Sequence, residues 1–148
     1  MPDDLTDGIA AALAGGAPAG WARITLTVSS TVLADDYALQ VKLGDGRNGS
    51  MTAPPAVKTG FERLRERMYE PGRGTWFSAT VDLRAGAAPE FTYNFDDDPR
   101  WWPPLHPAAF SRDLEAFPRD DEHIPPWLRE LLDEGGRLEQ ERAAPDVP

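Results

Sequence analysis

The sequence predicts an α+β fold in which an antiparallel β-sheet of about four strands carries helices packed on one face. Four segments alternate apolar and polar residues with the period of two that is typical of half-buried strands. Other segments repeat apolar residues every three or four positions, as amphipathic helices do. Most consecutive strands are joined by connections too short for a parallel crossover, which favours antiparallel pairing.

The first part of the chain is expected to form one helix and two strands. Apolar residues recur at four-residue spacing over residues 4–14, which predicts a short helix, and GGAPAG then ends it. Alternation predicts strands at 23–28 and 37–43. The glycine-rich GDGRNGS that follows is expected to be a loop, and it lacks the GKS or GKT ending of a phosphate-binding loop.

The middle of the chain is expected to contribute a longer helix and two more strands. Pro54 and Pro55 suit the first turn of a helix that continues to about residue 69. An apolar stripe supports this helix, formed by Val57, Phe61, Leu64 and Met68. PGRG ends it, and alternation predicts strands at 77–83 and 90–95.

The last third of the chain changes character. Residues 96–106 are expected to form an irregular loop, followed by a helix over 107–117 and another that starts at Pro125 and Pro126. The two glycines of EGGR are expected to weaken or end that last helix. We therefore expect one α+β domain over residues 1–142 and a frayed tail at 143–148.

Charge and composition narrow the possible functions. The net charge is −10, and residues 96–148 hold 14 acidic against 6 basic residues. Such a surface repels nucleic acid and anionic lipid and favours a basic partner, although it also serves solubility. The absence of cysteine excludes disulfides, thiol nucleophiles and zinc-thiolate sites. The acidic start MPDDLTDG and the shortness of the next apolar run predict a cytoplasmic protein without membrane association.

The candidate binding surface lies in the irregular segment after the fourth strand. An exposed tryptophan beside acidic residues is typical of a protein-binding hot spot. The residues that we expect to form this surface are Asp96, Asp97, Asp98, Trp101 and Trp102, with help from Asp120, Asp121 and Glu122. Two adjacent tryptophans in a loop seldom both point inward, so one is expected to pack against the body and the other to be exposed.

Two further tryptophans bear on the same question. Alternation places Trp76 on the face opposite Phe77, where its indole would be a further exposed side chain. Trp127 follows the two prolines of the last helix and is expected to pack that helix against the body.

Other uses of the acidic residues stay open. Asp97 or Asp98 can cap a turn before Pro99, a common role of aspartate. Clustered carboxylates also suit Mg²⁺ or Ca²⁺, but the spacing does not fit an EF-hand, and no metal or cofactor is predicted. An alternative is a small hydrolase that uses Asp97 or Asp98 with His106. Neither this histidine nor His123 has a recognisable spacing to a serine and a carboxylate, so no catalytic residue is predicted.

Several short motifs resemble the YezG/EsaG-type immunity proteins in their actinobacterial form. In order along the chain they are GTWFSATV at 74–81, YNFDDDPRW at 93–101 and DEHIPPWL at 121–128. An amphipathic helix ending R-x-R-M-Y precedes them, and the resemblance covers about residues 20–132. It implies an α+β fold and an antitoxin role against a secreted toxin encoded by the adjacent gene, such as a nuclease or an NAD-glycohydrolase domain.

The two lines of reasoning agree on a non-enzymatic binding protein. The resemblance brings no catalytic residues, and the residues themselves show no catalytic constellation. An acidic surface would occupy the basic cleft of a toxin and be steered to it quickly. A general adaptor module without a toxin partner is the remaining alternative, and the oligomeric state stays open.

Overall fold

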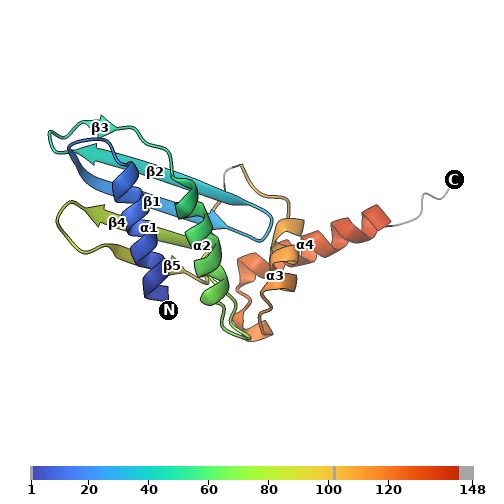
Figure 1. The fold of residues 1–148 in the computed structure, drawn as a ribbon. Coiled ribbons are helices and arrows are strands. Elements are labelled where there is room, and N and C mark those ends of the chain that lie inside the picture. Colours follow the sequence, from blue (N-terminus) through green and yellow to red (C-terminus); the bar gives the residue numbers. More distant parts are fainter. Residues whose placement is uncertain (1, 102, 144–148) are drawn as a thin grey trace.

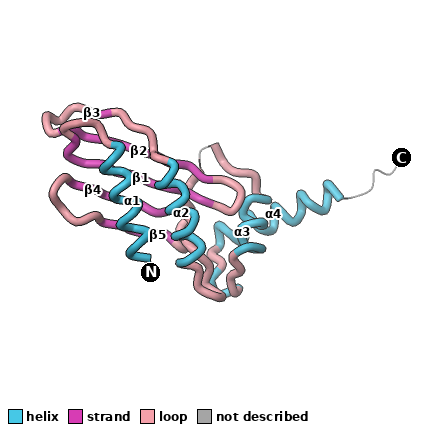
Figure 2. Tube along the Cα trace, viewed as in Figure 1, coloured by secondary structure: helices cyan, strands magenta, loops and turns pink. Residues whose placement is uncertain are grey.

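The computed structural model describes residues 2–101 and 103–143. The elements in chain order are α1 (Pro2–Gly16), β1 (Trp21–Ser30), β2 (Asp35–Leu43), β3 (Asn48–Gly49), α2 (Pro55–Arg67), β4 (Ser78–Arg84), β5 (Glu90–Asn94), α3 (Ala108–Ala116), the 3-10 turn η1 (Asp121–His123) and α4 (Pro126–Ala143). All strand pairs of the sheet are antiparallel, in the order β3-β2-β1-β4-β5. Figures 1 and 2 show α1 and α2 side by side across one face of this sheet.

The predicted α+β class is confirmed, with five strands where about four were expected. The additional strand is β3, a two-residue strand within the glycine-rich segment that follows β2. A strand of two residues is too short to show the alternation by which the other strands were recognised.

The main core lies between the sheet and the helix pair α1–α2. It contains Ile24, Leu26 and Val28 from the central strand β1, all of them fully buried. Their alternation with half-buried polar residues is the pattern expected when one sheet face is covered and the other meets water. Gly60 lets the two helices approach closely, because a Cβ at this position would collide with the side chain of Ile9.

A second, smaller core joins the helices α3 and α4 to the end of the sheet. Phe77, Phe110 and Leu128 are its buried members. Trp127 stands edge-on to both phenylalanine rings, with ring centroids 5.3 and 5.9 Å away, so it packs α4 onto the body as predicted. Figure 1 shows this helical pair beside the sheet, away from α1.

The structure corrects two sequence-based expectations: that the two glycines end the last helix, one of the two outcomes expected there, and that Trp76 is exposed. The last helix continues past Gly135 and Gly136 to Ala143, because Gly135 is buried where α4 packs against α3. A Cβ on Gly135 would lie 2.7 Å from the Ser111 hydroxyl oxygen, so the glycine permits close helix packing. Trp76 is not an exposed indole, since it is fully buried in the main core against Phe61. It precedes the first residue of β4, and strand alternation therefore does not extend to it.

Part of the expectations concerns residues outside those that the structure describes. Trp102 and residues 144–148, most of the expected tail, lie outside the described residues. Among the helices of residues 2–101 and 103–143, none is both long and apolar enough to cross a lipid bilayer.

Candidate partner-binding surface

The surface is organised by Arg119, a basic residue at the start of the acidic RDDEH segment. Its side chain is 1% exposed and lies over the ring of Phe77, with the guanidinium carbon 4.7 Å from the centroid. The guanidinium donates hydrogen bonds to three backbone carbonyl oxygens, those of Thr75 at 3.0 Å, Phe95 at 2.5 Å and His123 at 2.9 Å. Burial lowers the pKa of Arg119, and the nearby charges of Asp96 and Asp113 oppose that shift.

The glycines of the PGRG turn give Arg119 the space that it occupies. Gly74 has a φ of 91°, and a Cβ on it would overlap the Arg119 side chain. Gly72 has a φ of 83°, and a Cβ there would overlap the carboxylate of Asp120. The Gly72 carbonyl accepts a hydrogen bond from the backbone N–H of Asp120 at 2.6 Å. The turn after α2 is therefore fitted to the acidic segment that follows α3.

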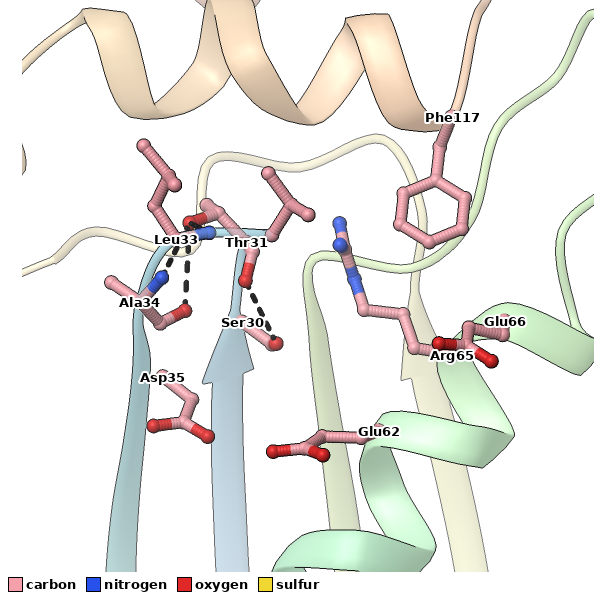
Figure 3. Close-up of a pocket in the computed structure, with 10 residues that line it drawn as sticks. Ser30, Thr31, Leu33, Ala34, Asp35, Glu62, Arg65, Glu66 and Phe117 are labelled. Atoms are coloured by element: carbon pink, nitrogen blue, oxygen red, sulfur yellow. Dashed lines mark hydrogen bonds between the residues drawn. The ribbon is translucent and has the colours of Figure 1, made fainter.

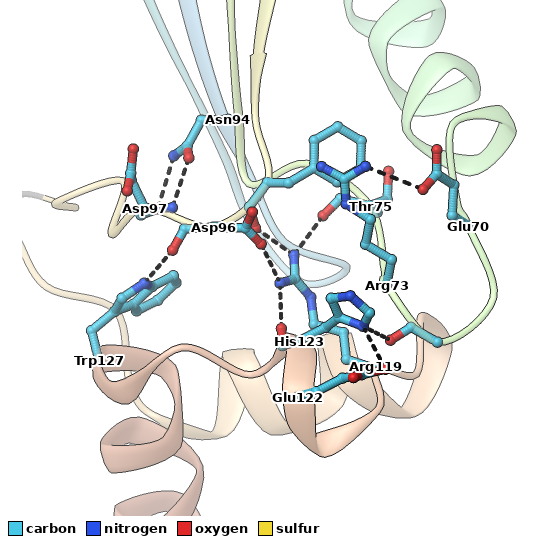
Figure 4. A network of polar contacts seen from close by, with 12 residues as sticks. Glu70, Arg73, Thr75, Asn94, Asp96, Asp97, Arg119, Glu122, His123 and Trp127 are labelled. Carbon is cyan, nitrogen blue, oxygen red and sulfur yellow. Dashed lines mark hydrogen bonds and ion pairs between the residues drawn. The ribbon is translucent and has the colours of Figure 1, made fainter.

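These contacts bring two distant acidic segments onto one surface. Arg119 binds the Phe95 carbonyl and lies 3.4 Å from the Asp96 carboxylate, while its own segment continues directly into Asp120, Asp121 and Glu122. Trp127 adds a second link, because its indole N–H donates to the Asp96 carbonyl at 2.7 Å. Figure 4 shows Asp96, Arg119 and Trp127 connected in this way, with His123 and Glu122 close by. This network therefore holds the segment that contains Asp96 next to the segment that contains Asp120, Asp121 and Glu122.

Three of the six aspartates and glutamates engage their own chain. Asp96 pairs with Arg119, and Asp121 pairs with Arg129 at 3.0 Å. Asp98 accepts the backbone N–H of Arg100 at 2.9 Å and closes a turn in which Arg100 has a φ of 57°. Asp98 thus takes the turn-capping role that the sequence left open beside partner binding.

The other three carboxylates remain available. Asp97, Asp120 and Glu122 are exposed, and none of their carboxylates forms an ion pair with an arginine or lysine of the described residues. The Asp97 backbone is nevertheless fixed, because Asn94 bonds to both its N–H and its carbonyl at 2.8 Å. Nearby Arg73 is engaged with Glu70 and lies over the ring of Phe95. Ordered backbone with unpaired carboxylates is the arrangement that a cationic partner can use.

The tryptophans contribute less exposed surface than the sequence suggested. Trp101 is partly buried, packs against the second core, and has a buried indole N–H without a hydrogen-bond partner in the described part of the chain. It can present only part of its ring at the edge of the acidic surface. Trp102, the other expected anchor, lies outside the described residues.

In the described residues, His106 contacts the start of a helix and not the loop carboxylates. The Nδ1 of His106 accepts the backbone N–H of Ala108 at 3.0 Å, where α3 begins. No hydrogen bond or ion pair joins His106 to Asp97 or Asp98 within residues 2–101 and 103–143. His106 therefore serves the start of a helix, and this geometry gives no support to the hydrolase alternative.

One group of side chains is close enough to share a cation. Donor atoms of Asp120, Glu122 and His123 lie within 4.8 Å of one another. The Nδ1 of His123 also faces the carbonyl of Gly72 at 3.2 Å. Exposed carboxylates commonly cluster without a metal, so the absence of a metal site stays a prediction.

Sequence reasoning did not identify Arg119 as the organising residue. A single arginine in an acidic segment shows no periodicity, and its three carbonyl partners belong to the backbone and carry no side-chain signature. The available signal in the sequence was a basic residue directly before the acidic run DDEH. Comparison with known proteins assigns no family to the chain, because no protein-family model and no curated protein sequence matches it.

Proposed function

We propose that this protein is an immunity protein that binds and neutralises a toxin encoded beside it. The observation that carries the proposal is the network around Arg119, which holds two acidic segments side by side. Within the described residues, the carboxylates of Asp97, Asp120 and Glu122 form no ion pair with an arginine or lysine. The resemblance implies toxins such as nucleases, and a nuclease needs a basic cleft to bind the phosphate groups of its substrate.

The electrostatics explain how such a surface would work. Exposed carboxylates accelerate the encounter with a cationic cleft, since long-range attraction raises association rates by about 10- to 1,000-fold. Because the backbone of both segments is already hydrogen-bonded, binding orders little additional chain, which preserves affinity. Partly buried Trp101 supplies apolar contact at the edge of the surface.

Co-expression tests the proposal directly. The adjacent toxin gene should arrest growth when it is expressed alone, and co-expression of the wild-type protein should restore growth. The triple variant Asp97→Asn, Asp120→Asn, Glu122→Gln should fail to restore it, because it removes three charges without removing side-chain volume. A matched control is Glu130→Gln, Asp133→Asn, Glu134→Gln on exposed positions of α4.

The outcomes separate the alternatives. Rescue by wild type and by the control, but not by the triple variant, supports neutralisation through the acidic surface. Equal rescue by all three proteins would remove this surface from the mechanism. An adjacent gene product that is not toxic and does not bind would favour a general adaptor.

A further inference from the structure

A second surface of the protein has features of a docking site. Val32 and Leu33, at the tip of the β1–β2 hairpin, are 47% and 64% exposed. They are the only exposed large hydrophobic side chains among residues 2–101 and 103–143. If a partner covers these side chains, the apolar area that it removes from water contributes favourably to binding.

The hairpin tip is held in one shape. The hydroxyl oxygen of Thr31 accepts the backbone N–H groups of Leu33 and Ala34 at 3.3 and 3.2 Å. The backbone N–H of Val32 donates to the buried carboxylate of Asp113 in α3 at 2.8 Å. The exposed pair is therefore a fixed feature, and a partner would meet it already in position.

A hollow of about 450 Å³ lies between this tip and α2. Figure 3 shows Thr31 and Leu33 on one side, with Arg65 and Phe117 on the other. Asp35 and Glu62 reach into the space below the tip. Volumes in this range are typical of sites that receive a ligand or an anchoring side chain.

The charge of the hollow is negative despite its one arginine. The side chain of Arg65 is 4% exposed, and its charge is already paired. Its guanidinium donates to both carboxylate oxygens of Asp113 at 2.5 and 2.8 Å and to the Trp76 carbonyl. The three other charged residues of the lining are Asp35, Glu62 and Glu66, and none of them forms an ion pair in the described part of the chain. Lys58, on the same helix as Glu62 and Glu66, lies over the ring of Tyr37, with its Nζ 5.4 Å from the ring centroid.

The negative charges of the hollow also affect the pKa of the neighbouring Tyr37. Burial raises the pKa of this phenol above its ordinary value, and the negative charges of Asp35 and Glu62 raise it further. Both carboxylates therefore act on the same small region, at the base of the hairpin and beside α2.

We propose that this hollow receives an arginine or lysine side chain from the surface of the protein partner. The aliphatic stem would lie on Val32 and Leu33, and the charged head would face Asp35, Glu62 and Glu66, as amphipathic cationic side chains bind elsewhere. The inference rests on the proposed function only in taking that basic toxin as the partner. It adds a second contact region that lies apart from the residues of the Arg119 network.

The test measures affinity for the toxin encoded beside the gene by biolayer interferometry. Glu62→Gln with Glu66→Gln should weaken binding at least 10-fold, because it removes two charges from the hollow. Leu33→Ser should weaken it by a similar factor through loss of the apolar contact. The matched control is Glu130→Gln with Glu134→Gln, which has the same four-residue spacing on exposed α4 and should change affinity less than twofold. Circular dichroism confirms that each variant is folded.

The comparison with the acidic-surface variant separates the two proposals. If the triple variant of Asp97, Asp120 and Glu122 loses affinity while both hollow variants bind within twofold of wild type, the hollow is not a contact and this inference is wrong. If wild type does not bind the toxin at all, the proposed function fails instead. In either case, titration with N-acetyl-arginine amide tests whether the hollow itself binds a cationic side chain. Binding is observed as changes in amide chemical shifts by NMR.

The titration has its own neutral control in N-acetyl-citrulline amide. Shifts confined to Leu33, Glu62 and Glu66, seen with the arginine probe and lost in the Glu62→Gln, Glu66→Gln variant, support a site for a cationic side chain. Equal shifts with citrulline, or arginine shifts spread over all acidic surfaces, would overturn it. A polyamine that binds the hollow more tightly than the arginine probe would show a small-molecule site and would also contradict the proposal.

Discussion

Replacement of Arg119 by methionine is the most informative single perturbation of the fold. Methionine fills part of the same volume beside Phe77 but cannot donate a hydrogen bond. The carbonyls of Thr75, Phe95 and His123 would then lose their common donor. A buried acceptor left without a donor typically costs about 1–3 kcal/mol, so losing the donor shared by three carbonyls should cost about 3–5 kcal/mol in total.

Urea denaturation followed by circular dichroism measures this cost. A loss of about 3–5 kcal/mol would leave a domain of average stability folded at 25 °C and lower its thermal midpoint by about 10–16 °C. Arg119→Lys is the matched control, since it keeps a cation but cannot reach three carbonyls in one plane, and it should fall between wild type and Arg119→Met. A loss below about 1 kcal/mol for Arg119→Met would refute the view that Arg119 organises this region.

Three further outcomes follow from the same contacts. Asp113→Asn should cost about 3–5 kcal/mol of unfolding free energy in urea, because buried Arg65 keeps its charge and loses its carboxylate; an unchanged stability would contradict the pairing. The hydrogen bonds from Arg23 lower the pKa of Asp82, so this pair stabilises the protein above the unfolded pKa of about 4 and its contribution is lost as pH falls through the lower folded value. Asp82→Asn should therefore lower the thermal midpoint at pH 7 but not near pH 2. Ultraviolet titration should place the pKa of Tyr37 above the usual 10, and Glu62→Gln should bring it down; no change would show that Glu62 does not act on this phenol.

Much of the fold was predictable because its strands and helices are periodic. The central strand β1 alternates buried Ile24, Leu26 and Val28 with polar residues, and α2 carries its apolar stripe at Val57, Phe61 and Leu64. These patterns arise from burial on one face, which sequence records directly. The tiny strand β3 and the passage of α4 through two glycines depend on neighbouring elements, and no local pattern records them.

The candidate site was predictable only in part. The acidic residues could be named from composition, but not their division into those paired within the chain, such as Asp96 and Asp121, and those left unpaired. That division depends on Arg119 and Arg129, which reach them from other elements. The hairpin tip was missed because Val32 and Leu33 form a short apolar pair that sequence alone cannot distinguish from core residues.

Hydrogen–deuterium exchange on the complex with the adjacent toxin tests the central claim most directly. We expect toxin binding to slow exchange in peptides that cover 93–101 and 117–124, the two segments joined by Arg119, while β4, which is paired on both sides by β1 and β5, stays unchanged. Slower exchange confined to other parts of the chain, with both acidic segments exchanging as in the free protein, would contradict the account.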